Sequence, residues 1–189
     1  MKKKLIIAGW LCLIVLLIIL ANTMPTLENK TKAAEFTYQH PQDNYSLDVQ
    51  GLWQVYDTDK TSLTLVNAEY DCTIELNLEV GGYDYLTPTA AANKFIAANT
   101  EKFPDFTVTE GPAEGSIGGY TSAAYLCTFS KGKDAYCGEM AVVHPNEGIR
   151  LYMSFIYPAD CETQIVQEGE AIMRSLKFSD TEALYPKFM

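Results

Sequence analysis

The stretch "CTIELNLEV" (72–80) decides the fold class, because its apolar and polar residues alternate without interruption. Apolar side chains recur at every second position from Cys72 to Val80, and threonine, glutamate and asparagine fill the positions between them. A period of two is typical of a β-strand with one face in a core and the other in water. The stretch therefore predicts a sheet that buries one of its faces.

Other stretches on both sides of this strand have a similar composition, and each predicts a strand. They are "FTYQ" (36–39), "YSLDV" (45–49), "WQVY" (53–56), "SLTLV" (62–66), "IRLYMSFIY" (149–157) and "LKF" (176–178). "SAAYLCTFS" (122–130) and "AYCGEMAVVH" (135–144) flank a Lys-Gly-Lys turn and predict a hairpin. Because hairpin spacing dominates, we expect a largely antiparallel sheet.

Two segments are predicted to be helices. In "TPTAAANKFIAANTEK" (87–102), Thr87 is the expected N-cap, a proline follows it at the first helical position, and alanines favour the helix. In "DCETQIVQEGEAIMRSL" (160–176), Asp160 is the expected cap, and Gly169 weakens the helix by roughly 1 kcal/mol relative to alanine. The order of elements predicts an α+β fold, a largely antiparallel β-sheet sandwiched by helices.

The N-terminus predicts a membrane segment. "MKKK" precedes "LIIAGWLCLIVLLIILA" (5–21), which has no charge and no proline and is close to the roughly 17–25 residues of a membrane helix. We interpret residues 1–21 as an uncleaved signal anchor, with a cleaved signal peptide as the alternative. The positive-inside rule then leaves the lysines in the cytoplasm and the rest of the chain outside, at a single-pass cell membrane.

The remaining chain is long enough for one domain. Residues 22–35 are polar and lack periodicity, so we expect a tether between the membrane and the domain. A single domain is predicted over residues 36–179, and residues 180–189 are expected to form a C-terminal tail.

The exterior part of the chain is strongly acidic. The whole chain has 14 basic and 24 acidic residues, and removing the three lysines of "MKKK" leaves 11 basic against 24 acidic, a net charge of −13. Such a surface repels nucleic acid and anionic lipid headgroups, so neither is an expected partner. Simple solubility explains the charge, and a basic partner or a cation is the alternative.

Motifs for catalysis are missing from the sequence. There is no GxSxG elbow, no SxxK and no phosphate loop. His40 and His144 both precede a proline, which favours an extended conformation and predicts surface positions at strand ends. We therefore assign no catalytic, cofactor-binding or metal-binding residue, and we expect no cofactor.

Four cysteines lie outside the membrane segment, and none belongs to a CxxC pair. In an oxidising exterior they are candidates for disulfides. Whether Cys127 and Cys137 can meet depends on the hairpin register, since a shift of one residue moves a side chain to the other face. The pattern leaves the register open, and we predict a Cys127–Cys137 disulfide and, by exclusion, Cys72–Cys161.

The start of the domain, "NYSLDVQGLWQVY" (44–56), resembles the opening motif of the PsbP-like superfamily, which includes exported domains like those of PsbP, DcrB and LpqN. "IMRSLKF" (172–178) is similar to the closing helix and strand of that family. The resemblance implies an antiparallel sheet sandwiched by helices, in which Tyr45, Leu47 and Trp53 are core residues. It also implies a non-catalytic binding or assembly-stabilising part rather than an enzyme.

These observations favour one function over two alternatives. We expect a membrane-anchored, extracytoplasmic, non-catalytic domain of a bacterial envelope that binds an envelope protein or stabilises an assembly. One alternative is an envelope enzyme, either a hydrolase built on acidic residues or a thiol enzyme. The other is an acidic domain that binds a small ligand or a cation.

Overall fold

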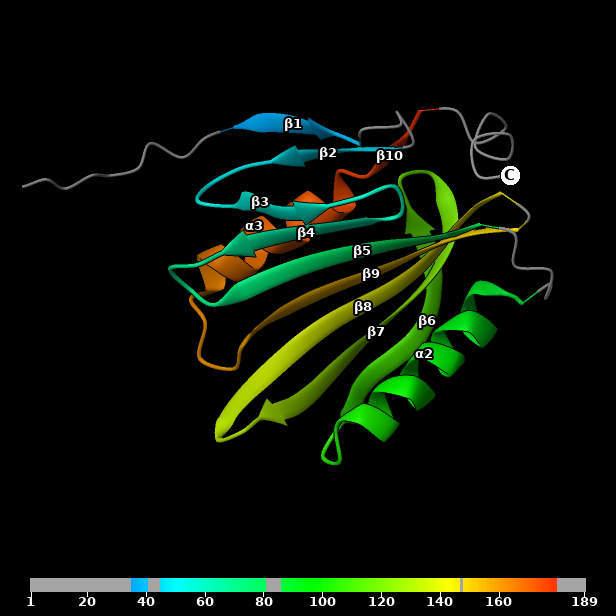
Figure 1. Ribbon diagram of the computed structural model, residues 1–189. Helices are drawn as coiled ribbons and strands as arrows, with labels where there is room; N and C mark the ends of the chain where they lie inside the picture. The colour runs from blue at the N-terminus through cyan, green and yellow to red at the C-terminus, as the bar shows by residue number, and fades with distance from the viewer. Residues whose placement is uncertain (1–34, 41–44, 81–85, 147, 180–189) are drawn as a thin grey trace, which may run out of the picture. The chain divides into compact units, whose positions relative to one another are not determined.

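The computed structural model describes residues 35–40, 45–80, 86–146 and 148–179 (Figure 1). The predicted membrane segment (5–21), nearly all of the predicted tether (22–35) and the predicted tail (180–189) lie outside these residues. The chain divides into two compact units, Met1–Ala33 and Ala34–Met189. Neither helix of the described residues combines the length and the apolar composition that a membrane crossing requires.

The second unit contains ten strands and two helices in its described part. In chain order they are β1 (Phe36–Gln39), β2 (Tyr45–Val49), β3 (Gln54–Thr58), β4 (Ser62–Asn67), β5 (Cys72–Val80), α2 (Pro88–Lys102), β6 (Thr107–Ile117), β7 (Tyr120–Lys131), β8 (Asp134–Asn146), β9 (Ile149–Pro158), α3 (Thr163–Arg174) and β10 (Lys177–Phe178).

The strands form two antiparallel sheets rather than one (Figure 1). The larger sheet has seven strands in the order β3-β4-β5-β9-β8-β7-β6, and the smaller has three in the order β1-β2-β10. Gly51 separates β2 from β3 in a turn with φ +74°, a conformation that glycine adopts readily. The chain passes there from the small sheet to the large one.

One core lies between the large sheet, the small sheet and α3. The alternating residues of β5 that the sequence singled out are all buried there or packed against its edge. Trp53 and Tyr45 are almost completely buried, as the resemblance implied, and the Trp53 ring meets the Phe155 ring edge-on at 5.8 Å. Gly169 of α3 lies over the same phenylalanine, and a Cβ added at this glycine would lie 2.6 Å from Phe155 Cε1. The glycine therefore permits close packing of α3 on the sheet.

A second core lies on the opposite face of the large sheet, beneath α2. Phe95 of α2 packs edge-on against Tyr125 and Tyr152, with ring centroids 6.4 and 5.5 Å away. Ala91 and Ala92 are completely buried, which brings the helix close to β7 and β8. The two helices thus cover different faces of the large sheet, and the predicted sandwich is confirmed in this coarse form.

The predicted N-cap is correct for one helix and wrong for the other. The Thr87 hydroxyl accepts a hydrogen bond from Ala90 N at 3.2 Å, so the predicted N-cap of α2 is confirmed. The prediction that Asp160 caps the second helix is wrong, because α3 begins at Thr163 after Glu162, whose side chain makes no capping bond. Asp160 belongs instead to the turn that follows β9.

Strand β6 was missed because its sequence does not alternate. "TVTEGPAEGSI" (107–117) contains two glycines and a proline, and its pairing with β7 shifts register twice. Both features are typical of an edge strand with bulges, and neither produces a period of two.

Candidate binding groove

A groove lies on the α3 side of the large sheet, over β6, β7 and the neighbouring part of β8. It has a volume of about 210 Å³. Its lining residues are Glu110, Gly111, Ala113, Ala124, Tyr125, Leu126 and Glu139. The lining combines small or apolar side chains with two carboxylates.

Strand register explains why the side chains of Glu110, Leu126 and Glu139 share one face, whereas the side chain of Tyr125 lies on the α2 face. Leu126 of β7 lies directly opposite Glu110 of β6 and Glu139 of β8, and Glu139 lies opposite Phe155 of β9. Residues directly opposite in antiparallel strands point to the same face of a sheet. One row of side chains therefore runs from Phe155, beneath α3, out to Glu110 at the sheet edge.

The groove exists because α3 covers only part of this row. The helix packs over Phe155 through Gly169. It does not extend over Leu126, whose side chain is 38% exposed. The neighbouring row of side chains on the same face contains Ala124 and Ala113, which lie opposite each other. Their short side chains leave space above the sheet. The outer strands thus present an uncovered hollow with an apolar floor.

A bulge in β6 forms the outer wall of the groove. The pairing with β7 skips from Glu110 to Ala113, and Gly111 between them has φ +88°. A Cβ at Gly111 would lie 2.6 Å from the backbone oxygen of Ala124, so only glycine lets the two strands approach this closely.

Glu139 is the most unusual side chain of the groove. It is half-buried, and no other described residue makes a hydrogen bond or ion pair with its carboxylate. Burial raises the pKa of Glu139, and the charge of Glu170 on α3 raises it further, while Arg174 acts in the opposite direction. Arg174 already donates to Glu170 at 3.0 Å. The groove therefore holds a carboxylate for which the described part of the chain supplies no cationic partner.

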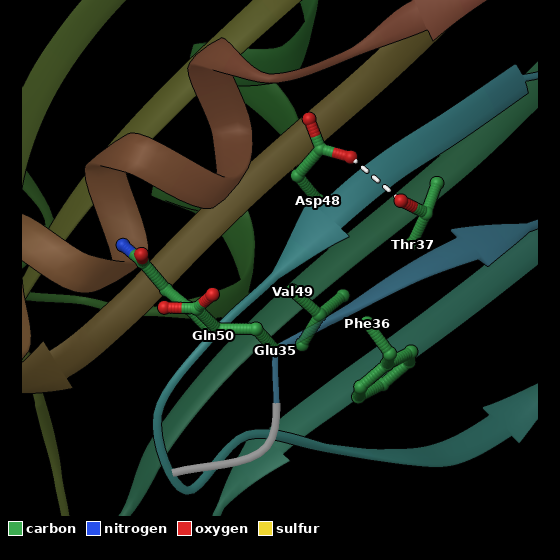
Figure 2. A pocket seen from close by; sticks show the side chains of 6 residues that line it. All are labelled: Glu35, Phe36, Thr37, Asp48, Val49 and Gln50. Carbon is green, nitrogen blue, oxygen red and sulfur yellow. Dashed lines mark hydrogen bonds between the residues drawn. The ribbon is translucent and has the colours of Figure 1, made fainter.

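A second hollow, of about 400 Å³, lies at the start of β1 and the end of β2 (Figure 2). Figure 2 shows Asp48 and Thr37 pointing toward each other, and Thr37 Oγ1 donates to Asp48 Oδ1 at 2.9 Å. Lys177 Nζ donates to the other Asp48 oxygen at 3.2 Å. Because these bonds already satisfy the Asp48 carboxylate, this hollow is the weaker candidate for a binding site.

A cluster of polar side chains lies on the other face of the large sheet. Arg150, which is 5% exposed, donates to Glu79 Oε2 at 3.4 Å, and the Tyr152 hydroxyl donates to the same oxygen at 3.1 Å. Burial lowers the pKa of His144, and the Arg150 charge lowers it further, so this histidine is neutral near pH 7. The ion pair and the hydroxyl bond satisfy Glu79, which makes the cluster a part of the sheet rather than an open site.

The predicted surface position of the other histidine, His40, is wrong. His40 follows β1 as expected, but it is completely buried rather than exposed. Its ring packs against Tyr45 with centroids 4.8 Å apart, and its Nε2 lies 3.0 Å from the backbone oxygen of Asp59. Among the described residues, no three His, Cys, Asp or Glu side chains are grouped to hold a metal ion.

The hairpin register contradicts the predicted Cys127–Cys137 disulfide. Cys127 lies opposite Gly138, and Cys137 lies opposite Thr128, so the two cysteines are one register position apart. Their side chains therefore point to opposite faces of the sheet. The sulfur of Cys127 lies in the core beneath α2, whereas Cys137 shares the α3 face with Tyr157. A disulfide cannot pass through the sheet between them.

Cys72 and Cys161 lie close together. The two sulfurs are 3.6 Å apart, and both cysteines are free thiols in this structure. Cys72 begins β5, and Cys161 lies in the turn before α3, so the contact joins the sheet to the approach of the helix. Burial and the neighbouring Cys161 both raise the pKa of Cys72.

Comparisons with known proteins agree with this architecture. No protein-family model and no curated protein matches the sequence. The fold is similar to PsbP (CyanoP) from the cyanobacterium Synechocystis, with a TM-score of 0.59 and 12% identity over 82% of this chain and 98% of that chain.

Two further solved structures share the fold. The Ran-binding protein Mog1p of Saccharomyces cerevisiae matches with a TM-score of 0.56 and 10% identity over 80% of this chain and 98% of that chain. LpqN of Mycobacterium tuberculosis, involved in cell envelope biogenesis, matches with a TM-score of 0.54 and 14% identity over 79% and 92%. The chain also covers 49% of a longer Bacteroides thetaiotaomicron structure, with a TM-score of 0.50 and 13% identity. The described residues between 35 and 179 therefore have the PsbP-like fold that the opening motif of the domain predicted.

Proposed function

We propose that this domain binds another protein of the cell envelope, without catalysis, while residues 5–21 hold it at the outer side of a membrane. The observation that carries the proposal is the groove over β6, β7 and β8, where an exposed leucine lies between two carboxylates on a sheet face that α3 leaves open. Apolar surface beside polar groups is typical of a protein contact.

The structural relatives support the same class of function. Mog1p is a Ran-binding protein and LpqN is involved in cell envelope biogenesis, so the fold occurs both in a binding protein and in a protein of envelope biogenesis. Shared fold alone does not define activity, and for this reason the proposal depends on the groove rather than on the relatives.

The buried thiols of Cys72 and Cys127 are poor candidates for the nucleophile of a thiol enzyme. Catalytic cysteines require a depressed pKa, because the thiolate is the nucleophile. Burial instead raises the pKa of Cys127 to about 11, and it also raises the pKa of Cys72. We therefore expect these two thiols to be protonated near neutral pH.

We also propose that Cys72 and Cys161 form a structural disulfide. The sulfurs lie 3.6 Å apart and need to approach to about 2.05 Å, a movement within reach of small side-chain rotations. An exterior location would supply the oxidising environment.

Chemical crosslinking in native membranes, followed by mass spectrometry, tests the proposed function. The full chain is expected to yield a reproducible envelope-protein partner, and the yield is expected to fall several-fold when Leu126→Ser replaces the apolar centre of the groove. The absence of any reproducible partner across crosslinkers of different length would contradict the proposal.

A further inference from the structure

We propose that the groove recognises a segment of the partner that carries a lysine or arginine beside a large apolar side chain. This inference rests on the proposed function and adds the chemistry of the partner. The groove offers two neighbouring features, an apolar hollow and an unpaired carboxylate, and a matching segment must supply one group for each.

The apolar half of the site is formed by Leu126 together with Ala113 and Ala124. The hollow of about 210 Å³ is large enough for one side chain of the size of leucine or phenylalanine, but not for a whole element of secondary structure. Burying such a side chain contributes roughly 1.5–3 kcal/mol before the costs of association. The hollow thus selects one apolar anchor.

The charged half of the site is formed by Glu139 and Glu110, which flank Leu126 in the same row. Glu170 on α3 faces Glu139. The cationic neighbour on α3 is Arg174, and its guanidinium group already binds the Glu170 carboxylate at 3.0 Å. On this face, the described residues of β6, β7 and β8 include no lysine and no arginine. A cation from a partner would gain a charge-assisted bond with Glu139 and relieve its repulsion from Glu170.

The edge strand of the large sheet also indicates that the partner is recognised through side chains rather than through backbone pairing. β6 is the outermost strand, but Gly111 and Pro112 interrupt it beside the groove, and proline has no backbone N–H to donate. A partner strand therefore cannot extend the sheet continuously along this part of the edge. The partner segment must bind across the face of the sheet, where Leu126 and Glu139 are accessible.

Two matched peptides test the chemistry directly. Acetyl-Leu-Lys-Leu-amide and acetyl-Leu-Glu-Leu-amide are titrated into the isotope-labelled full chain in nonionic detergent micelles, and amide shifts are followed by NMR. The lysine peptide is expected to shift the amides of Glu110, Leu126 and Glu139, and the glutamate peptide is expected to leave them unchanged. Equal shifts with both peptides, or none in the groove with the lysine peptide, would overturn the inference.

A pair of variants distinguishes specific binding in the groove from attraction of the peptide by the negative net charge of the protein. Glu139→Gln removes the groove carboxylate at constant size, and it is expected to weaken binding of the lysine peptide about tenfold, as for the loss of one charge-assisted bond. Glu75→Gln removes an exposed carboxylate from the opposite face of the same sheet and is expected to change nothing. Equal weakening by both variants would show that net charge, rather than the groove, attracts the peptide.

The peptide result and the crosslinking result can be told apart. If crosslinking in native membranes yields a partner whose contact lies away from Leu126 and no peptide shifts the groove, the proposed function stands and the inference fails. If no partner is found by any crosslinker, the proposed function itself fails, whatever the peptides do.

Discussion

Glu139 is held in a folded environment that disfavours its charge. The chain gives it no hydrogen bond from the described residues, and the groups that face it are Glu110 on β6, Tyr157 on β9 and both Glu170 and Arg174 on α3. These surroundings disfavour the charged form of Glu139, and the partner cation proposed above would remove the conflict.

The raised pKa of Glu139 predicts a pH-dependent cost to stability. A carboxyl whose folded pKa lies above its unfolded value favours folding at low pH, where it is neutral, and this contribution is lost as the pH rises through the folded pKa. Glu139→Gln should therefore raise the melting temperature at pH 7, and the difference from the parent chain should disappear near pH 3. Thermal unfolding at several pH values measures this, and a lower melting temperature of the variant at pH 7 would contradict the assigned environment.

At Gly169, close packing against Phe155 outweighs the helix propensity of the residue. Alanine would favour the helix by roughly 1 kcal/mol, but its Cβ would lie 2.6 Å from Phe155 Cε1, and overpacking costs about 1–3 kcal/mol. Gly169→Ala should therefore lower the free energy of unfolding by about 1 kcal/mol.

The matched control for Gly169 is the reverse change at an exposed position of the same helix. Ala171→Gly makes no new contact and should lower the free energy of unfolding by roughly 0.5–1 kcal/mol through propensity alone. Chemical denaturation measures both variants. A Gly169→Ala chain more stable than the parent would show that α3 does not pack closely on Phe155.

At the level of the elements, the β7–β8 hairpin was predicted from sequence but its register was not. Both strands alternate, and the turn at Gly132 was visible, because glycine tolerates its φ of +68°. The register depends on how the loop closes, and a change of one residue exchanges the faces of all side chains. Since both faces of this hairpin carry apolar side chains, the apolar pattern could not choose between the two registers.

The contact between β5 and the turn before α3 gives a prediction for the remaining cysteine pair. Peptide mapping without reduction should find Cys72 linked to Cys161, with Cys127 and Cys137 as free thiols. The bond should stabilise the fold by about 2–4 kcal/mol, which the Cys72→Ser and Cys161→Ser variants would lose alike. Alkylation of all four thiols in the native protein, before any reductant is added, would rule the bond out.

For the molecule as a whole, the sequence predicted the fold class and the core, but not the groove. Tyr45, Leu47 and Trp53 were assigned to the core correctly through the resemblance to the PsbP-like family, whose opening motif contains them. The division into two sheets was missed, since alternation within a strand does not reveal its neighbours. Leu126 belongs to a strand that mixes apolar and hydroxyl side chains, and its exposure depends on how far α3 extends over the sheet.

The central claim is that the open face of β6, β7 and β8 is the surface that contacts a partner. Site-specific photocrosslinking in native membranes, with a photoreactive phenylalanine derivative at position 126 and, as control, at position 75 on the opposite face, tests it most directly. We expect one discrete crosslinked protein from position 126, lost when Glu139→Lys reverses the groove charge, and no such product from position 75. The same product from both positions, or none from position 126, would contradict the account.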